Sequence, residues 1–267
     1  MISRKQLMAA LPIRSITDIM SSVFDGEETM AGRITSFEKA YAEYFDGGRF
    51  DPMKYLESQS KTDALTDILY WPPNSQGNIN YPFAVPDKKI KDGLKKFSGP
   101  IGAQTSTYHQ ETIREHLCCV TARLSNTEID GLDKQDILLT ALLHDAGKKY
   151  TAGTNAKRQS DTDPHGQLCF YGHEKVSAYI TARVLKDMGY SREKAEVLVT
   201  AIYNHLALKV APYKMDLDMN SLAGKLQKAL SDVDEGYRSL EEIDEDRGTI
   251  EQGKEIVIHL SEELIHK

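Results

Sequence analysis

The sequence predicts an all-α protein, and two patterns of residues carry this prediction. Beyond residue 110, apolar residues recur at intervals of three and four, which is the period of an amphipathic helix. The chain shows no alternation of strand-like and helix-like segments, which a parallel sheet would require. Its 267 residues suffice for one large domain, or for one domain with an extension. We expect a helical bundle over residues 101–245, an N-terminal helical extension of unknown role over residues 1–100, and a C-terminal helix in 246–267 that packs on the bundle.

Residues 1 to about 70 read as amphipathic helices, interrupted at Asp25-Gly26 and at Asp46-Gly47-Gly48. A short basic helix is expected over residues 88–96, and the step Gly99-Pro100 closes this region. The sequence assigns no function to the extension.

Five helices are predicted beyond residue 110, each from apolar residues at helical spacing. Ser191 is expected to cap the fourth helix, and a polar loop is expected over residues 151–168. An acidic stretch at 241–246 precedes a last helix over 256–266. The residues that mark the five helices are Ile113, Leu117, Val120 and Leu124; Ile137, Leu138, Ala141 and Leu142; Val176, Ile180, Val184 and Met188; Ala195, Leu198 and Ile202; and Leu222, Leu226, Ala229, Leu230 and Val233.

The composition excludes several classes of protein. No apolar run approaches the roughly 18 residues that span a bilayer, so no membrane association is expected. The three cysteines include the adjacent pair Cys118 and Cys119 and form no CxxC motif, which argues against a disulfide-linked partner and favours a cytoplasmic protein. A formal charge of −7 argues against sequence-independent binding of long duplexes. A small nucleotide or an RNA end remains compatible with this charge, because a metal supplies local positive charge.

Four histidines stand at alternating ends of the predicted helices. His116 lies near the start of the first helix, His144 at the end of the second, His173 at the start of the third and His205 near the end of the fourth. Consecutive helices that pack antiparallel bring the start of one beside the end of the next. The four imidazoles are therefore expected at the same end of the bundle.

Two aspartates complete a candidate metal site. Asp145 directly follows His144, and its two carboxylate oxygens suit it to bridge two ions. The fifth helix offers Asp232, which follows the apolar spacing of that helix, with Asp234 as the competing choice. Mixed nitrogen and oxygen ligands favour one or two divalent transition ions, namely Mn, Fe, Ni, Co or Zn, with Mg also possible. Such a pair of ions supplies hydroxide near neutral pH and binds phosphate oxygens.

These residues resemble those of a known family. His116, His144-Asp145 and a downstream aspartate resemble the HD superfamily of metal-dependent phosphohydrolases, and His173 and His205 resemble its dinuclear branch. The segments 109–116, 144–148 and 170–174 are similar to HD domains of CCA-adding tRNA nucleotidyltransferases and of RNA-repair enzymes. The resemblance covers about residues 100 to 240. Residues 1–100 contain no nucleotidyltransferase motif, and no GxxxxGK[ST] kinase loop occurs anywhere in the sequence. The resemblance implies an HD-domain bundle that hydrolyses 2′,3′-cyclic phosphates, 2′-phosphates or nucleotides.

We assign the expected roles accordingly. The metal ligands are His116, His144, Asp145, His173, His205 and Asp232, and the catalytic residues are Asp145, Lys148 and Glu174. Substrate contacts are expected from Lys148, Arg158 and His109. Each assignment has a simpler alternative: Lys148 complements a helix end, Arg158 is a solvated loop charge, and Glu174 orients His173. His205 has the alternative of a core or rim histidine beside a mononuclear site. As a whole, the alternative function is an HD-fold nucleotide-binding or regulatory module with a structural metal.

Overall fold

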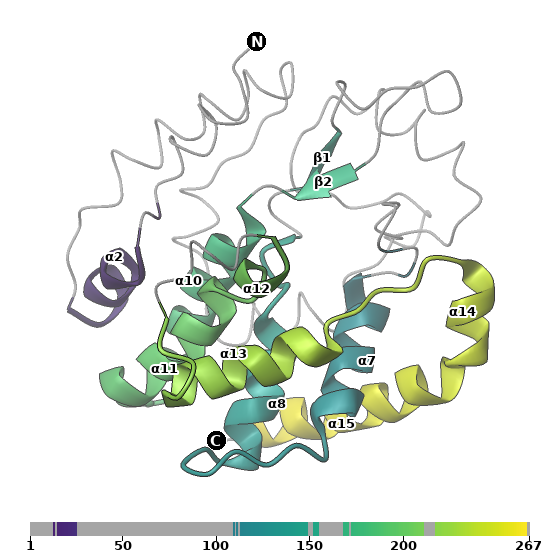
Figure 1. Ribbon diagram of the computed structural model, residues 1–267. Helices are drawn as coiled ribbons and strands as arrows, with labels where there is room; N and C mark the ends of the chain where they lie inside the picture. The colour runs from purple at the N-terminus through teal and green to yellow at the C-terminus, as the bar shows by residue number, and fades with distance from the viewer. Residues whose placement is uncertain are drawn as a thin grey trace.

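The computed structural model describes residues 13, 15–25, 109, 111, 113–148, 152–154, 168–170, 172–210 and 217–265. These residues are predominantly helical, which confirms the predicted all-α class (Figure 1). Of the helices expected over residues 1 to about 70, the structure describes residue 13 and residues 15–25, and the helix expected at 88–96 lies outside the described residues. Within the described part, no helix combines the length and the apolarity needed to cross a membrane.

Two antiparallel helices form the centre of the bundle, α7 (Ile113–Leu124) and α8 (Lys134–Leu143). Buried residues lie on all sides of α8, as expected for a central helix. The helix begins after Asp133, whose backbone N–H donates to Asp136 Oδ2 over 3.0 Å. It ends at Leu143, so His144 and Asp145 follow directly after the last turn of α8 and remain buried.

A small hairpin leads into the next pair of helices. The strands β1 (Ala152–Thr154) and β2 (Leu168–Phe170) pair antiparallel, at the two ends of the segment expected to be a polar loop. The chain enters α10 (His173–Asp187) through Gly172, whose φ of 83° is readily adopted only by glycine. The following helix, α11 (Arg192–Tyr203), has the predicted cap, because Ser191 Oγ accepts the Lys194 N–H over 3.2 Å.

The last part of the bundle is a short helix, α12 (Ala207–Val210), followed by α13 (Leu222–Val233). Ser221 caps α13, since its Oγ accepts the Gly224 N–H over 3.1 Å. Leu226 and Leu230 are fully buried on the inner side of α13. The helix therefore packs through the apolar face that its sequence pattern indicates.

The C-terminal region is more helical than the sequence pattern suggests. The acidic stretch contains α14 (Leu240–Glu245), and α15 (Arg247–Ile265) begins nine residues before the expected position 256. Arg247 accounts for part of this difference, because it pairs with Asp244 at 3.1 Å and with Glu115 of α7 at 2.9 Å. These contacts offset the repulsion between acidic side chains that the sequence alone suggests.

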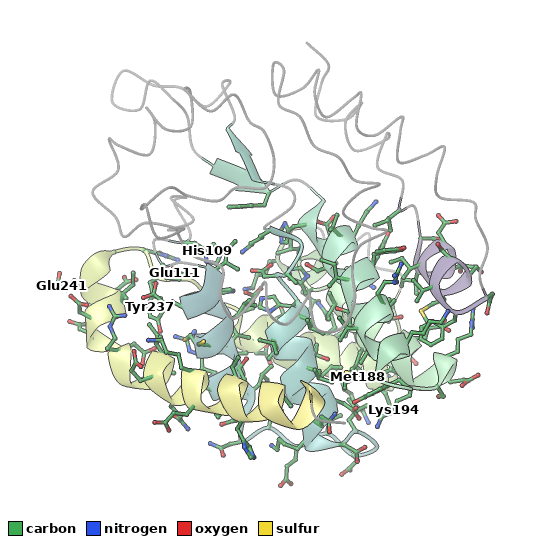
Figure 2. The ribbon with its side chains drawn as sticks, turned by 180° about the vertical axis from the view of Figure 1, so that it is seen from behind. His109, Glu111, Met188, Lys194, Tyr237 and Glu241 are labelled. Atoms are coloured by element: carbon green, nitrogen blue, oxygen red, sulfur yellow. The ribbon has the colours of Figure 1, made fainter. Side chains whose placement is uncertain are left out.

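Close packing holds α15 on α7. A methyl group at Gly253 would lie 1.9 Å from the backbone oxygen of Cys118, so only glycine allows this approach. The segment before α14 returns to the start of α7, where Tyr237 lies near Glu111 and His109 (Figure 2). The C-terminal region is thus built onto the bundle along the whole length of α7.

Residues near the N-terminus share the same core. The short helix α2 (Ile16–Met20) continues into one π-helical turn, η1 (Ser21–Asp25). Ile19, Met20 and Val23 are buried in the same hydrophobic cluster as the bundle helices. The described part of the predicted extension therefore packs on the bundle.

Candidate metal centre

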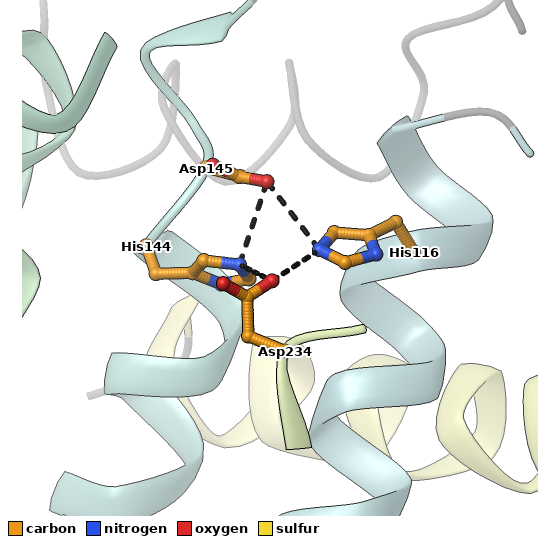
Figure 3. A group of neighbouring side chains, drawn as sticks. All are labelled: His116, His144, Asp145 and Asp234. Atoms are coloured by element: carbon orange, nitrogen blue, oxygen red, sulfur yellow. Dashed lines mark hydrogen bonds and ion pairs between the residues drawn. The ribbon is translucent and has the colours of Figure 1, made fainter. Parts of the chain in front are cut away.

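Six buried side chains meet at one end of the bundle, and we call them the ligand cluster. None of the six residues is more than 7% exposed. They come from the start of α7, the turn after α8, the start of α10, the turn after α11 and the residue after α13. Figure 3 shows four of them in one group. The cluster consists of His116, His144, Asp145, His173, His205 and Asp234.

Asp145 lies at the centre of the ligand cluster. Its Oδ2 is 3.4 Å from Nε2 of both His116 and His144. Its Oδ1 is 3.2 Å from His173 Nε2 and 3.5 Å from His205 Nε2. Each carboxylate oxygen therefore faces a different pair of imidazoles, which is the arrangement expected of a carboxylate that bridges two ions.

The aspartate from the α13 region that lies in the ligand cluster is Asp234, and not the predicted Asp232. Asp234 Oδ1 lies 3.0 Å from His116 Nε2 and 3.4 Å from His144 Nε2. The Asp232 side chain is 59% exposed and pairs with Lys228 on the surface of α13. The apolar spacing favours Asp232 because that residue belongs to the helix. Asp234 instead reaches the cluster because the backbone leaves the helix at this residue and turns toward the bundle.

Backbone carbonyls fix the orientation of three imidazoles. In each case Nδ1 faces the carbonyl three residues earlier, so a neutral ring that donates from Nδ1 directs an Nε2 lone pair into the cluster. The distances are 2.8 Å for His144 to Ala141, 2.6 Å for His173 to Phe170 and 2.7 Å for His205 to Ile202.

The unpaired atoms of the ligand cluster fit a metal. Seven buried side-chain atoms in the described part of the chain lack a hydrogen-bond partner, and six of them belong to this cluster. They include Nε2 of His144, His173 and His205 and both oxygens of Asp145. Buried polar atoms without partners are costly, and one or two divalent ions would satisfy these lone pairs.

The comparisons with known proteins agree with this geometry. The HD domain family model matches residues 113–235. These residues form an HD domain. All six residues of the ligand cluster lie within the matched range, and the last of them, Asp234, lies one residue before the end of that range. HD domains are generally metal-dependent hydrolases, and the buried cluster can hold such a metal. Neither the curated proteins nor the solved structures contain a significant match to this chain.

Two lysines lie beside the two carboxylates of the ligand cluster. Lys148 Nζ is 2.5 Å from Asp145 Oδ2, in a residue only 5% exposed. Lys209 Nζ donates to the backbone oxygen of Asp234 and lies 3.5 Å from its Oδ2. The sequence analysis missed Lys209, although its position four residues after His205 was a usable signal. Each carboxylate of the cluster thus has one ammonium group beside it.

The charges of the cluster are interdependent. Burial raises the pKa of Asp145, but the Lys148 ammonium and His144 outweigh it and hold that pKa well below its ordinary value. Burial likewise raises the pKa of Asp234, and hydrogen bonds from His116 and His144 lower it well below its ordinary value. Both carboxylates are therefore anionic over the neutral range, as ligands of a cation must be.

Glu111 and His109 lie beside the His116 ring and form an outer layer of the site. Glu111 Oε1 is 2.7 Å from His109 Nδ1 and 3.1 Å from His116 Nδ1. Burial and the charge of Lys148 lower the pKa of His109 to about 4, so its ring is neutral at pH 7. The His-x-Glu pattern before His116 was the signal for Glu111, which the sequence analysis left without a role.

Burial lowers the pKa of His116, yet Asp234 and Glu111 raise it to about 9. A metal ion held by this ring would therefore have to displace a proton.

The remaining predicted residues stand farther from the centre or outside the described part. Glu174 Oε2 is 3.9 Å from His173 Nδ1, on the side of the ring that faces away from Asp145. His109 contacts the His116 ring edge to face at 4.8 Å between centroids. Arg158 lies outside the described residues.

Gly147 brings two ligand-bearing elements together. A methyl group at this position would lie 2.3 Å from the His173 backbone oxygen and 2.6 Å from the Ser177 nitrogen. In addition, the Gly147 N–H donates to Ser177 Oγ over 2.9 Å. The absence of a side chain thus lets the turn that carries Asp145 pack directly on the start of α10.

Proposed function

We propose that this protein is a metal-dependent phosphohydrolase that cleaves phosphomono- or phosphodiester bonds of a nucleotide or of an RNA-terminal 2′,3′-cyclic or 2′-phosphate. The observation that carries the proposal is the position of Asp145, whose two oxygens face two separate pairs of histidines. This geometry favours a dinuclear centre over a mononuclear one. A purely structural site would instead close all ligands around one ion.

The chain's own residues hold the ions and the substrate. His116, His144 and Asp234 form one ligand group, and His173 and His205 form the other, with Asp145 shared. When bound, a divalent transition ion supplies Lewis acidity toward phosphate and lowers the pKa of water. With cations held by Asp145 and Asp234, the ammonium groups of Lys148 and Lys209 would lose these carboxylates as partners. Lys148 and Lys209 can then pair with phosphate oxygens instead.

The outer residues have narrower roles in this proposal. Lys148 stabilises the negative charge that develops on the phosphate. Glu174 orients His173 or donates a proton to the leaving group. His109 and Arg158 contact the substrate, and the neutral His109 ring does so without adding charge. The choice of a nucleotide or RNA end rests on the similarity of segments 109–116, 144–148 and 170–174 to HD domains of RNA metabolism.

Turnover by the full-length protein tests the proposal. The metal-free protein would be loaded separately with Mn²⁺, Fe²⁺, Co²⁺, Ni²⁺, Zn²⁺ or Mg²⁺ and the bound metal measured. Substrates would be 2′,3′-cyclic AMP, nucleoside 2′-phosphates, nucleoside triphosphates and a generic phosphodiester. We expect hydrolysis of at least one substrate with at least one metal: a diester or cyclic phosphate would yield a phosphomonoester, and a monoester would release inorganic phosphate. Binding of nucleotides without turnover, in protein shown to contain metal, would instead establish the regulatory-module alternative.

Lys209 provides a matched test of substrate binding. Lys209→Ala is expected to raise KM about 10-fold, as loss of one charge-assisted hydrogen bond predicts. Lys228→Ala removes a lysine of α13 that pairs with the exposed Asp232, and should leave KM unchanged. Equal KM values for the two variants would remove Lys209 from the substrate site.

A further inference from the structure

One histidine of the ligand cluster is held differently from the other three. His144 and His205 follow helix ends, and their Nδ1 atoms face carbonyls of the last helical turn, which have acceptor capacity to spare. His173 begins a helix and uses the carbonyl of Phe170 in the preceding strand. His116 lies within α7, where backbone carbonyls are used by the helix itself. Its Nδ1 therefore needs a partner from another part of the chain.

Glu111 is placed to be that partner. Its Oε1 lies 3.1 Å from His116 Nδ1, although the ring is turned away from ideal hydrogen-bond geometry. Its Oε2 accepts the backbone N–H of Tyr237 over 2.9 Å. Tyr237 follows Asp234 by three residues, so this bond holds the segment that carries the last ligand. The two oxygens of one carboxylate thus reach two ligand-bearing elements that are distant in sequence.

The burial of Glu111 makes these contacts consequential. The residue is 0% exposed, and its carboxylate oxygens face His109, His116 and the backbone N–H of Tyr237. A buried carboxylate is stable only when its partners compensate for lost hydration. The same compensation restrains the partners, because moving the His116 ring or the 234–237 segment would take one of its partners away from the buried carboxylate.

We propose that Glu111 is a positioning residue of the metal centre, which orients the His116 ring and anchors the segment that carries Asp234. The inference rests on the proposed metal centre and goes beyond it by naming the group that sets its affinity. Glu111 acts through His116 and Asp234 and does not touch the reacting atoms. It performs for His116 the task that backbone carbonyls perform for the other three imidazoles.

Metal titration of the full chain tests this role without requiring turnover. Zn²⁺ binding to metal-free protein would be measured calorimetrically, and Co²⁺ would report ligand geometry through its visible absorption. Loss of a carboxylate that orients a histidine typically weakens metal binding about 10- to 100-fold, which we expect for Glu111→Gln. The Co²⁺ spectrum should change as well.

The matched control is Glu115→Gln, which removes a carboxylate from the same end of α7 that pairs with Arg247 rather than with a ligand. It should bind both ions as the parent protein does. Parent-like binding by Glu111→Gln, or equal losses in the two variants, would overturn the proposal.

Nitrogen-15 spectra of the histidine rings of the Zn²⁺-loaded parent protein keep the inference testable even if Glu111→Gln does not fold. A ring oriented by Glu111 must carry its proton on Nδ1, so His116 should be the Nδ1–H tautomer. His109→Ala would identify the neighbouring ring in the spectrum. An Nε2–H tautomer at His116 would refute the role. Because both readouts report metal binding alone, a protein that binds metal but turns over no substrate would fail the proposed function and leave this inference standing.

Discussion

Two polar groups share the segment 234–237, and they differ in how their atoms are satisfied: Asp234 belongs to the buried ligand cluster, and Tyr237 to a partly buried network. The ligand cluster holds six of the seven partnerless buried side-chain atoms of the described chain. The second group, which we call the tyrosine network, joins α7 to the C-terminal helices and has no such atom. It consists of Cys119, Arg123, Tyr237, Asp246 and Thr249.

In the tyrosine network, the polar side chains are paired with one another, as expected of a group that only stabilises the fold. The Tyr237 hydroxyl donates to Asp246 Oδ2 over 2.6 Å and lies 2.9 Å from Cys119 Sγ. Arg123 adds a 3.1 Å bond to Asp246 and stacks over the Tyr237 ring at 5.6 Å. Each donor thus finds an acceptor inside the protein. The ligand cluster instead directs lone pairs at one another, an arrangement that a cation between them would stabilise.

The largest expected effect comes from the centre of the ligand cluster. Asp145→Ala removes both bridging oxygens and should weaken metal binding by more than about 100-fold, beyond the loss typical of an outer residue. Activity should disappear while the helical circular dichroism persists. Asp232→Ala is the control, since its side chain is exposed and pairs with Lys228. A change of equal size in both variants would contradict the assignment of the cluster.

The next effect concerns the packing that holds the cluster together. Gly147→Ala places a methyl group against the His173 backbone and should lower the free energy of unfolding by roughly 1–3 kcal/mol. It should also reduce the number of ions bound, because His173 is pushed away from Asp145. Gly248→Ala meets no atom within 4 Å and serves as the control. Urea denaturation and metal analysis would measure both effects.

A change in the tyrosine network should separate stability from metal binding. Tyr237→Phe removes the hydroxyl and should cost roughly 1–3 kcal/mol of unfolding free energy, since a hydrogen bond to the Asp246 carboxylate is lost. Metal affinity should not change, because the Tyr237 N–H still reaches Glu111. Calorimetric titration with Zn²⁺ beside thermal denaturation tests the separation. A weakened metal site would mean that the two groups are coupled through more than the backbone.

The smallest effect is a pH dependence of the tyrosine network. Burial raises the pKa of Asp246, but hydrogen bonds from Thr249, Tyr237 and Arg123 outweigh it and lower the pKa below its ordinary value. A depressed carboxyl pKa stabilises the fold above the unfolded pKa, and this contribution is lost as the pH falls through the folded value. Below about pH 4, the ordinary range of an aspartate, the stability advantage of the parent protein over Asp246→Asn should shrink. Denaturation midpoints of both proteins, measured from about pH 6 down to about pH 3, would detect this decrease. A difference in stability that stays constant over this pH range would exclude it.

Periodicity predicted the helices of the bundle well, because each buries one apolar face. Ile113, Leu117, Val120 and Leu124 are all buried, as their spacing indicates. The C-terminal helices were placed less well, since α14 and the first turns of α15 depend on contacts between distant charges. Arg247 illustrates this: its partner Glu115 is 132 residues away in the sequence.

The sequence by itself determined the helix order and placed four histidines at alternating helix ends, because helical period and antiparallel packing follow from local patterns. It also indicated that Asp145 would be shared between ligand groups. Only the tertiary structure chose Asp234 over Asp232 and introduced Glu111 and Lys209. Those choices depend on where the backbone leaves a helix and which side chains then meet across the bundle, and neither is encoded in spacing along one element.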